Sequence, residues 1–487
     1  MTILDFLYEY LGLFLVIMLL LDLLFLVIML FMEKQDPKSF INWVAIIIIF
    51  PIIGFILYLF IGQTYYMRRV FSVKGINDEL LMKQFEKEKQ KIEGLMESSD
   101  DILREYGEFA QYLKNAGAMA FSTNNKMELF TDGTAKFDSF MEDLRNAKEY
   151  IFIEYYIIRN DNLGNEFMDL LTQKVKEGVE VRLLTDAFGN GKGPKMGLKK
   201  FREAGGKFAM FHKTITLLFS PKKNNRNHRK IAVIDGKVSY VGGYNIGDEY
   251  LGKGPFGYWR DTALRIEGAA HAICVVRMIA DWNYCSHDKI EDTLKYLRRS
   301  EHVGNDAMQL VSGGPDIPYD NPVQFQYEGM MQYAQERLYI HTPYLAPNDA
   351  VMETLRTAAL RGVDVRIIVP DKPDHPGVFW NTMSSANKLM KYGIRVYLYH
   401  NGFIHSKAIV ADGKIGSVGS ANLDDRSLRL NFETNVQVYS ERICKELEEA
   451  FIKDLDYCEE YSCEKYDNKG LVNKIKTVLS SFFRDLA

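Results

Sequence analysis

Two stretches of the chain carry the same residue pattern, and this repeat limits most strongly what the chain can fold into. Residues 227–245 read NHRKIAVIDGKVSYVGGYN, and residues 404–422 read IHSKAIVADGKIGSVGSAN. From the histidine to the asparagine, nine of eighteen positions are identical at a constant offset of 177. Identity at histidine, lysine, aspartate, glycine and asparagine together predicts an internal duplication.

The elements around the repeat also occur twice in the same order. YIFIEYYI and RLYIHTPYL are strand-like, each is followed by a helical stretch, and GVEVRLLTD then matches GVDVRIIVPD. Strands that alternate with helices predict an α/β fold in which helices flank a sheet. The chain has 487 residues, of which 47% are hydrophobic, so it holds more than one domain. We place the two pseudo-symmetric copies at residues 116–310 and 311–487, after a helical connector at 67–115.

The amino-terminal residues 1–66 predict a transmembrane hairpin with two helices. Its apolar spans lie at about residues 11–32 and 40–62, and 22 helical residues reach about 33 Å, enough to cross a bilayer. The leading segment holds Asp5 and Glu9 but no lysine or arginine, which argues against a cleaved signal peptide. Pro51 and Gly54 predict a kink or a close helix contact in the second span.

Positive residues indicate the orientation of this hairpin. Arg68, Arg69 and Lys74 follow the second span, whereas the connector between the spans is balanced in charge. The positive-inside rule then places both chain ends, and the two α/β copies, in the cytoplasm. The sequence thus predicts a multi-pass protein of the cell membrane.

Each copy of the motif predicts a β-hairpin around an Asp-Gly turn. If Gly236 and Lys237 form a two-residue loop, Asp235 pairs with Val238 and Asn245 lies opposite His228. Residues two apart on a strand share a face, so His228 and Lys230 project together. One hairpin therefore presents an imidazole, an ammonium and a carboxamide, and His405, Lys407 and Asn422 do the same in the second copy.

These groups suit phosphoryl transfer. A lysine supplies positive charge to phosphate oxygens, an amide donates hydrogen bonds, and a neutral imidazole can attack phosphorus. Displacement of an alkoxide also needs an acid, which a second histidine can supply. The duplication therefore predicts one shared site, in which one histidine is the nucleophile and the other is the acid and base.

The candidate site residues fall into three groups. The repeated motif supplies the predicted catalytic set, although the two aspartates beside the turns are interpreted as structural: His228, Lys230, Asp235, His405, Lys407 and Asp412. The predicted phosphate-binding residues are Asn245, Asn422 and Ser420, of which Ser420 would add a hydroxyl where the first copy has Gly243. Each histidine needs an acceptor for its second nitrogen, and the candidates are Asp261 and Glu433.

The chain lacks the sequence signals of a metal, a cofactor or a nucleic-acid partner. No H-x-H, C-x-x-C or carboxylate cluster has metal-ligand spacing, so neither metal nor cofactor is predicted. The formal net charge is −4, which provides no overall basic field for nucleic acid.

At these motifs the chain resembles the phospholipase D superfamily, in which a duplicated H-x-K-x4-D motif builds one site between two α/β domains. The two-span amino terminus, RNHRK, HTPYL and NGFIHSK are similar to bacterial cardiolipin synthases over almost the whole chain. The resemblance implies that two phosphatidylglycerol molecules react through a phosphohistidine to give cardiolipin and glycerol. It favours His228 as the nucleophile, implies a lipid bilayer as partner, and leaves homo-oligomerisation open.

Three alternatives share part of this pattern. A membrane-bound phospholipase D would use the same residues but admit water. A nuclease of the superfamily would need a basic groove and would gain nothing from two spans. A non-catalytic membrane scaffold would ordinarily have lost one of the motif histidines or lysines, and all four are present.

Overall fold

The protein is described by a computed structural model that covers most of the chain. It describes residues 3–32, 37–50, 52–61, 74, 101–117, 119, 121–192, 195–212, 225–297, 303–317, 321–372 and 374–462. Parts of the predicted hairpin and connector, including Pro51, Gly62, Arg68 and Arg69, lie outside these residues.

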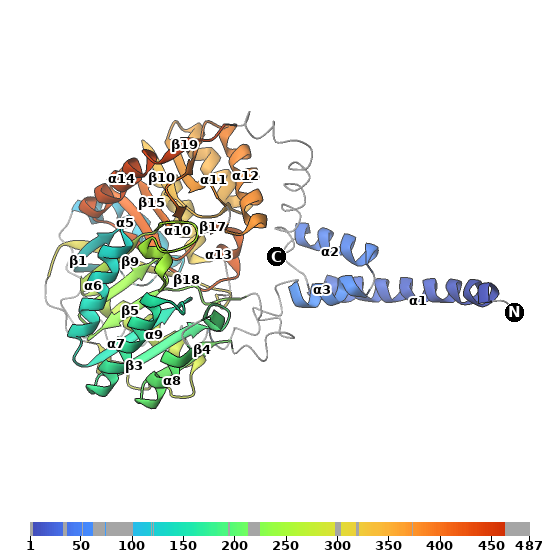
Figure 1. Cartoon of the computed structure of the whole chain (residues 1–487). Helices are drawn as coiled ribbons and strands as arrows, with labels where there is room; N and C mark the ends of the chain where they lie inside the picture. The colour runs from blue at the N-terminus through green and yellow to red at the C-terminus, as the bar shows by residue number, and fades with distance from the viewer. Residues whose placement is uncertain are drawn as a thin grey trace.

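Three helices at the amino terminus project from the α/β body (Figure 1): α1 (Ile3–Met32), α2 (Pro37–Ile49) and α3 (Ile53–Ile61). Within α1, Tyr10–Met29 has a mean hydropathy of 3.1 and is long and apolar enough to cross a membrane. It is the single helix of the described chain that meets this criterion by itself. The first predicted span is therefore one continuous apolar helix.

The second predicted span is divided between α2 and α3. Ile52 has a left-handed φ of 62° between them, and the Gly54 N–H donates to the Phe50 carbonyl over 2.7 Å. A Cβ atom on Gly54 would lie 2.8 Å from the Ile46 carbonyl oxygen, so only glycine permits this approach. The close helix contact predicted for Gly54 is thus present, and it lies where α3 folds back against α2 after the turn at Ile52.

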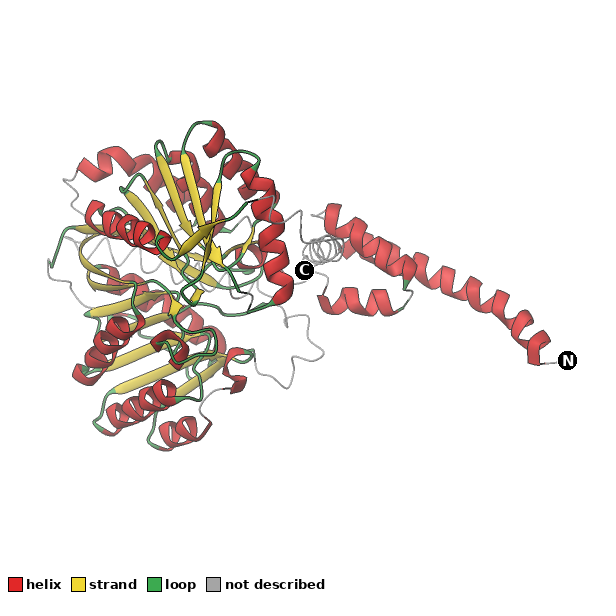
Figure 2. Ribbon diagram, turned by 45° about the horizontal axis from the view of Figure 1, so that its top comes forward, coloured by secondary structure: helices red, strands yellow, loops and turns green. Residues whose placement is uncertain are grey.

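One mixed sheet of 15 strands runs through both copies (Figures 1 and 2). From the centre outward, the first copy contributes β1 (Ser122–Phe130), β8 (Ala263–Gly268), β6 (Val238–Gly242), β5 (Ile231–Ile234), β2 (Tyr150–Tyr155), β3 (Glu180–Asp186) and β4 (Lys207–Phe211). The second contributes, in matching order, β9 (Asp306–Gly313), β18 (Glu433–Val438), β16 (Ile415–Gly419), β15 (Ala408–Ala411), β10 (Arg337–His341), β12 (Asp364–Pro370), β13 (Arg395–Tyr399) and β19 (Cys458–Glu460). The copies meet where β1 pairs antiparallel with β9.

The α/β prediction is confirmed, because helices cover both faces of this sheet (Figure 2). On one face, α9 (Ala270–Cys285) and α14 (Glu441–Leu455) share a single apolar core that extends across both copies. On the other face each copy has its own core. The helices there include α6 (Gly133–Asn146), α7 (Asn162–Lys176) and α8 (Lys195–Glu203) in the first copy, and α5 (Asp101–Asn115), α10 (Pro322–Tyr333), α11 (Asp349–Leu360) and α12 (Pro376–Met390) in the second.

Strand β2 illustrates why the central strands are apolar on both faces. All six of its residues are buried; Tyr150 and Phe152 enter the shared core, whereas Ile151 and Ile153 enter the core under α6 and α7. A strand between two layers of helices must bury both sets of side chains. The division proposed at residue 310 falls within β9, which is continuous from Asp306 to Gly313.

Both motif hairpins form, but their register differs by one residue from the prediction. Ile234, and not Asp235, pairs with Val238, and Ala411 pairs with Ile415. Asp235 leaves the ladder because it adopts a left-handed φ of 52°, followed by Gly236 at 61°. The prediction was wrong here because it placed the turn one position too late.

Candidate active site

Short segments cross between the two copies beside the motifs. β14 (Phe403–Ile404), just before the second motif, pairs in parallel with β7 (Trp259–Arg260) of the first copy. The equivalent bridge joins Asn227, just before the first motif, to Phe432 of the second copy. Each motif is thus held by the segment that follows the other motif.

These crossings fix the backbone of both histidines. The His228 N–H donates to the Phe432 carbonyl over 2.9 Å, and the His405 N–H donates to the Arg260 carbonyl over 2.7 Å. In each case the acceptor is the residue directly before a predicted orienting carboxylate. The two halves therefore use the same arrangement about a pseudo-twofold axis.

The carboxylates of these segments contact the histidine side chains. His228 Nδ1 lies 3.0 and 2.9 Å from the two carboxylate oxygens of Glu433, and His405 Nδ1 lies 2.6 Å from Asp261 Oδ2. Both carboxylates are fully buried. Each imidazole is thus paired with a carboxylate of the opposite copy through Nδ1, which leaves Nε2 as the nitrogen for chemistry.

The motif lysines lie beside their own histidines. Lys230 Nζ donates to the His228 carbonyl over 2.5 Å. Lys407 Nζ lies 2.8 Å from His405 Nδ1, contacts the His405 carbonyl, and is 3.9 Å from Asp261 Oδ2. Because His405 Nδ1 is paired with Asp261, the ammonium donates to oxygen and acts on the imidazole by its charge.

The three residues predicted to bind phosphate have different surroundings. Asn245 accepts the Ile157 N–H over 3.2 Å and donates to the Tyr250 hydroxyl over 3.3 Å. Asn422 donates to Asp424 over 3.4 Å, while its buried carbonyl oxygen has no partner among the described residues. Ser420 donates to Glu433 over 2.5 Å. The serine hydroxyl is therefore engaged with the carboxylate that holds His228.

Burial and neighbouring charges determine the pKa values of the two motif histidines. Burial, together with Lys407, lowers the pKa of His405 to about 3 against the opposing effect of Asp261. Burial also lowers the pKa of His228; Glu433 opposes this shift, and Lys407 of the other copy adds to it. Both imidazoles are thus held neutral, as a nucleophile requires.

The lysines lose basicity for the same reason. Burial lowers the pKa of Lys230 to about 7 and that of Lys407 to about 8. Each lysine also acts electrostatically on the other, or on the other copy's histidine. The two motifs therefore form one electrostatic unit.

Curated relatives match this chain over nearly its full length. It is 40% identical over 467 residues to a protein named cardiolipin synthase from Staphylococcus aureus, with 94% of each chain covered. It is 38% identical over 472 residues to one of the same name from Listeria monocytogenes, with 96% of this chain and 97% of the relative covered. The chain belongs to the cardiolipin synthase family.

The family model, described as cardiolipin synthase, PLD-like domain, matches residues 140–255 and 327–455. Each segment contains one motif histidine, so the same model matches both copies of the duplication in this chain. A second model, described as phospholipase D-nuclease N-terminal, matches residues 14–63. Among solved structures, phosphatidylserine synthase from Haemophilus influenzae has the same fold, with a TM-score of 0.57 at 16% identity over 74% of this chain and 93% of that chain.

Aromatic residues near the histidines were missed in the sequence. The Tyr156 ring centroid lies 4.9 Å from that of His228, and the Trp259 centroid lies 5.2 Å from that of His405. The Tyr250 hydroxyl is 3.3 Å from His405 Nδ1. Tyr156 follows directly after β2, and that position was the available signal for it.

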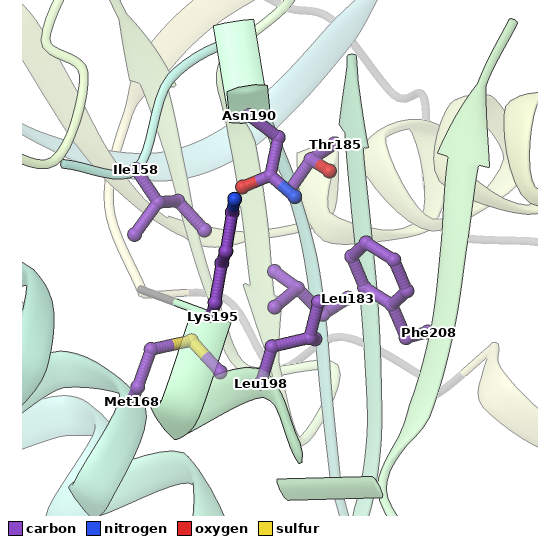
Figure 3. A pocket seen from close by; sticks show the side chains of 8 residues that line it. All are labelled: Ile158, Met168, Leu183, Thr185, Asn190, Lys195, Leu198 and Phe208. Atoms are coloured by element: carbon purple, nitrogen blue, oxygen red, sulfur yellow. The ribbon is translucent and has the colours of Figure 1, made fainter. Parts of the chain in front are cut away.

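A separate small cavity lies at one side of the first copy (Figure 3). Its volume is about 30 Å³, room for about one water molecule. Figure 3 shows Lys195 of α8 reaching toward Asn190 at its rim. The lining residues are Ile158, Met168, Leu183, Thr185, Asn190, Lys195, Leu198 and Phe208. None of them belongs to the repeated motif, and the space is too small for a lipid.

The motif aspartates lie at the hairpin turns and brace the backbone. Asp235 accepts the N–H groups of Lys148, Glu149 and Tyr150 over 2.7–2.9 Å. Asp412 accepts those of Gln335, Glu336 and Arg337 over 2.8–2.9 Å. Each carboxylate thus ties its turn to the start of a neighbouring strand outside the hairpin.

We expect unequal stability losses from the two turns. Asp235→Ala should lower the free energy of unfolding by about 3 kcal/mol, because it leaves a buried N–H at Tyr150 without an acceptor. Asp412→Ala should cost about 1 kcal/mol, because the N–H groups of Gln335 and Glu336 are exposed to water. Urea unfolding followed by circular dichroism measures both losses.

The asparagine variants are the matched controls. Asparagine tolerates a left-handed φ and keeps one acceptor oxygen, so Asp235→Asn should lose less stability than Asp235→Ala. Equal losses for the two turns, or for alanine and asparagine at residue 235, would contradict this account.

Proposed function

We propose that the chain transfers a phosphatidyl group between two phosphatidylglycerol molecules and forms cardiolipin and glycerol. The observation that carries this proposal is the exchange of carboxylates: each motif histidine is held at Nδ1 by the opposite copy. Two oriented imidazoles in one buried site provide a nucleophile and an acid for a phosphodiester. The names of the relatives supply the lipid class.

In the first step, the neutral Nε2 of one histidine attacks phosphorus of the first phosphatidylglycerol. The bond between phosphorus and the glycerol oxygen breaks, and the other histidine gives its proton to that oxygen. Glycerol leaves, and the phosphatidyl group stays bound to the first histidine. The two lysines attract the phosphate oxygens throughout this step.

In the second step, a headgroup hydroxyl of another phosphatidylglycerol attacks the phosphohistidine. The histidine that acted as the acid now takes the hydroxyl proton, the phosphorus–nitrogen bond breaks, and cardiolipin forms. Both histidines return to their starting states, and no water is consumed. The positive charges of the two motif lysines offset the negative charges of Glu433 and Asp261. One further proton, held by either histidine, then offsets the single negative charge of the bound phosphodiester.

We further propose that the amino-terminal helices cross the membrane twice and keep the α/β body on the cytoplasmic side. Residues 37–61 are 25 in number, which would be about 37 Å as one continuous helix, so the apolar sequence has the length for a second crossing. In the structure α3 instead folds back against α2, with the Trp43 and Tyr58 ring centroids 5.5 Å apart. The basic residues that follow in the sequence favour this orientation.

The product identifies the reaction. Purified full-length protein is incubated with phosphatidylglycerol labelled in its acyl chains, and the lipids are separated. Transfer gives labelled cardiolipin, whereas hydrolysis gives phosphatidic acid; glycerol is released in both reactions and does not discriminate. Phosphatidic acid without cardiolipin would refute the proposal and favour a hydrolytic phospholipase D.

The order of the histidines has its own test. Acid-free quenching followed by peptide mapping locates the phosphohistidine. A phosphate on His228 fits the family resemblance, whereas a phosphate on His405 fits the lower pKa that burial and Lys407 impose there.

The pKa values of the lysines predict an alkaline limit to activity. Each lysine is charged below its pKa and neutral above it, so kcat/KM should fall as pH rises above the values near 7 and 8 for Lys230 and Lys407. Arginine stays protonated throughout this range. Lys230→Arg should therefore have lower activity, but its kcat/KM should begin to fall at a higher pH.

Lys199→Arg is the control, because the Lys199 side chain is 77% exposed. It should leave the profile unchanged. The lysine account is wrong if kcat/KM stays constant up to pH values at which a solvent-exposed lysine loses its proton, about 10.

A further inference from the structure

Lys74 lies in the sequence behind the membrane hairpin, yet its side chain is buried in the α/β body. The residue is 2% exposed. Its ammonium lies 2.8 Å from Asp316 Oδ2, just after β9, and 3.2 Å from Asp281 Oδ1 in α9. The same ammonium is 5.1 Å from the ring centroid of Phe432, a distance at which a cation is attracted to an aromatic face.

The partners of Lys74 support the His228 half of the site. Asp281 also pairs with Arg229, the residue after His228, over 2.8 Å. Arg229 donates in turn to the backbone carbonyl of Glu433 over 3.2 Å, and the Phe432 carbonyl receives the His228 N–H. Lys74 therefore contacts two residues, Asp281 and Phe432, that are joined directly to His228 or to its neighbour Arg229.

The two carboxylates depend on Lys74 to different degrees. Asp281 has Arg229 and Arg277 as further partners, at 2.8 and 2.9 Å, and so keeps its charge balance without the lysine. For Asp316, Lys74 is the one cationic partner within the described part of the chain. Asp316 is thus the position where loss of the ammonium should have its main effect.

The short chain between the hairpin and Lys74 limits the distance between the end of α3 and the site. Lys74 follows Ile61, the last residue of α3, by thirteen positions. An extended chain covers at most about 3.6 Å per residue, so these positions reach at most about 47 Å. A lysine fixed beside the site therefore limits how far the site can stand from the end of the hairpin.

We propose that Lys74 is a positioning residue that fastens the segment behind the membrane hairpin to the His228 half of the site. The buried Lys74–Asp316 pair sets the reach of the site to lipids in the bilayer. This role rests on the proposed function, because it matters only for substrates confined to a membrane. A lysine that served only the membrane surface would keep its charge in water.

The test compares intact bilayers with micelles. Full-length Lys74→Met, Lys74→Arg and Asp316→Asn are assayed for cardiolipin formation on vesicles of phosphatidylglycerol and phosphatidylcholine, and in detergent micelles with the same lipids. Lys199→Met is the control for loss of an exposed lysine. In parallel, amide hydrogen exchange is measured in peptides that cover residues 225–230 and 313–317.

Lys74→Met should lose about tenfold or more on vesicles and less than about threefold in micelles, because unfastening lowers the effective concentration of the site at the bilayer. Asp316→Asn should lose activity in the same pattern, whereas Lys74→Arg should form cardiolipin at nearly the rate of the unaltered protein. In Lys74→Met, amide hydrogen exchange should be faster in both peptides. An equal loss in vesicles and micelles would indicate simple damage to packing and overturn the proposal. No loss in either would also overturn it.

Failure of the proposed function would look different. In that case the unaltered protein would form no cardiolipin in either system. The exchange experiment would then still test the fastening: faster exchange in both peptides of Lys74→Met but not of Lys199→Met supports it, and unchanged exchange overturns it.

Discussion

Replacing His228 or His405 with alanine is expected to lower cardiolipin formation at least about 10³-fold, and the double replacement should be little worse. Each histidine acts in both steps of the proposed cycle: one carries the phosphatidyl group, and the other moves the proton. Once either is lost, the remaining imidazole cannot complete a turnover. The measurement is labelled cardiolipin formed per unit time by the three variants.

A substrate with a better leaving group separates the two roles. In a phosphatidyl ester of 4-nitrophenol, nitrophenolate departs without a proton, so the variant that lacks the acid should still release it in the first turnover. The variant that lacks the nucleophile should not. Nitrophenolate release by rapid mixing therefore assigns the roles independently of cardiolipin formation.

His375→Ala is the control, because the His375 side chain is 72% exposed and lies outside the motifs. It should leave both assays unchanged. Near-normal turnover by either His228→Ala or His405→Ala would refute a shared site, and so would a double variant whose loss is the product of the two single losses.

The sequence predicted the parts of the site that depend on local pattern. The duplicated motif indicated the hairpins and both orienting carboxylates, the alternating strands and helices indicated the α/β class, and the structure places Glu433 and Asp261 in contact with the histidines. The exchange of partners between copies was not predicted. His228 and Glu433 are 205 positions apart and His405 and Asp261 are 144 apart, and no local pattern encodes a pairing at such separations.

The errors and omissions have particular physical causes. The hairpin register was wrong by one residue because Asp235 turns out of the ladder to accept three N–H groups at the start of β2, which the motif alone does not reveal. The Ser420 hydroxyl donates to the buried carboxylate of Glu433, which the sequence did not indicate, and its contact with phosphate stays a prediction. Lys74 was counted among the basic residues that flank the membrane. In the structure its side chain is buried and pairs with two carboxylates far along the chain, Asp281 and Asp316.

Replacing Gly243 with alanine is expected to lower cardiolipin formation at least about 10²-fold, because a displacement of about 1 Å at a catalytic group has this effect. A Cβ atom at residue 243 would lie 2.0 Å from Asp261 Oδ1. The carboxylate at the end of this side chain can shift to relieve the clash, but it would then leave His405 Nδ1, now 2.6 Å away. We therefore expect activity to fall much more than stability.

The equivalent position in the second copy gives the matched comparison. Ser420 already has a Cβ atom, and its hydroxyl donates to Glu433 over 2.5 Å and accepts the Thr434 N–H over 3.0 Å. Ser420→Ala removes this support without a clash, so we expect a loss of about tenfold, the effect of one charge-assisted hydrogen bond. The two copies should thus respond differently at one pseudo-symmetric position, the first through steric displacement and the second through a lost donor.

The role of His405 determines how Gly243→Ala should affect the reactions of phosphatidylglycerol and of the nitrophenyl ester. Because the change acts through the His405–Asp261 pair, its substrate profile should follow that of His405→Ala. If His405 is the acid, Gly243→Ala should release nitrophenolate at a rate close to that of the unaltered protein while forming little cardiolipin; if it is the nucleophile, both activities should fall. A Gly243→Ala profile that matches His228→Ala instead would show that Asp261 does not act through His405.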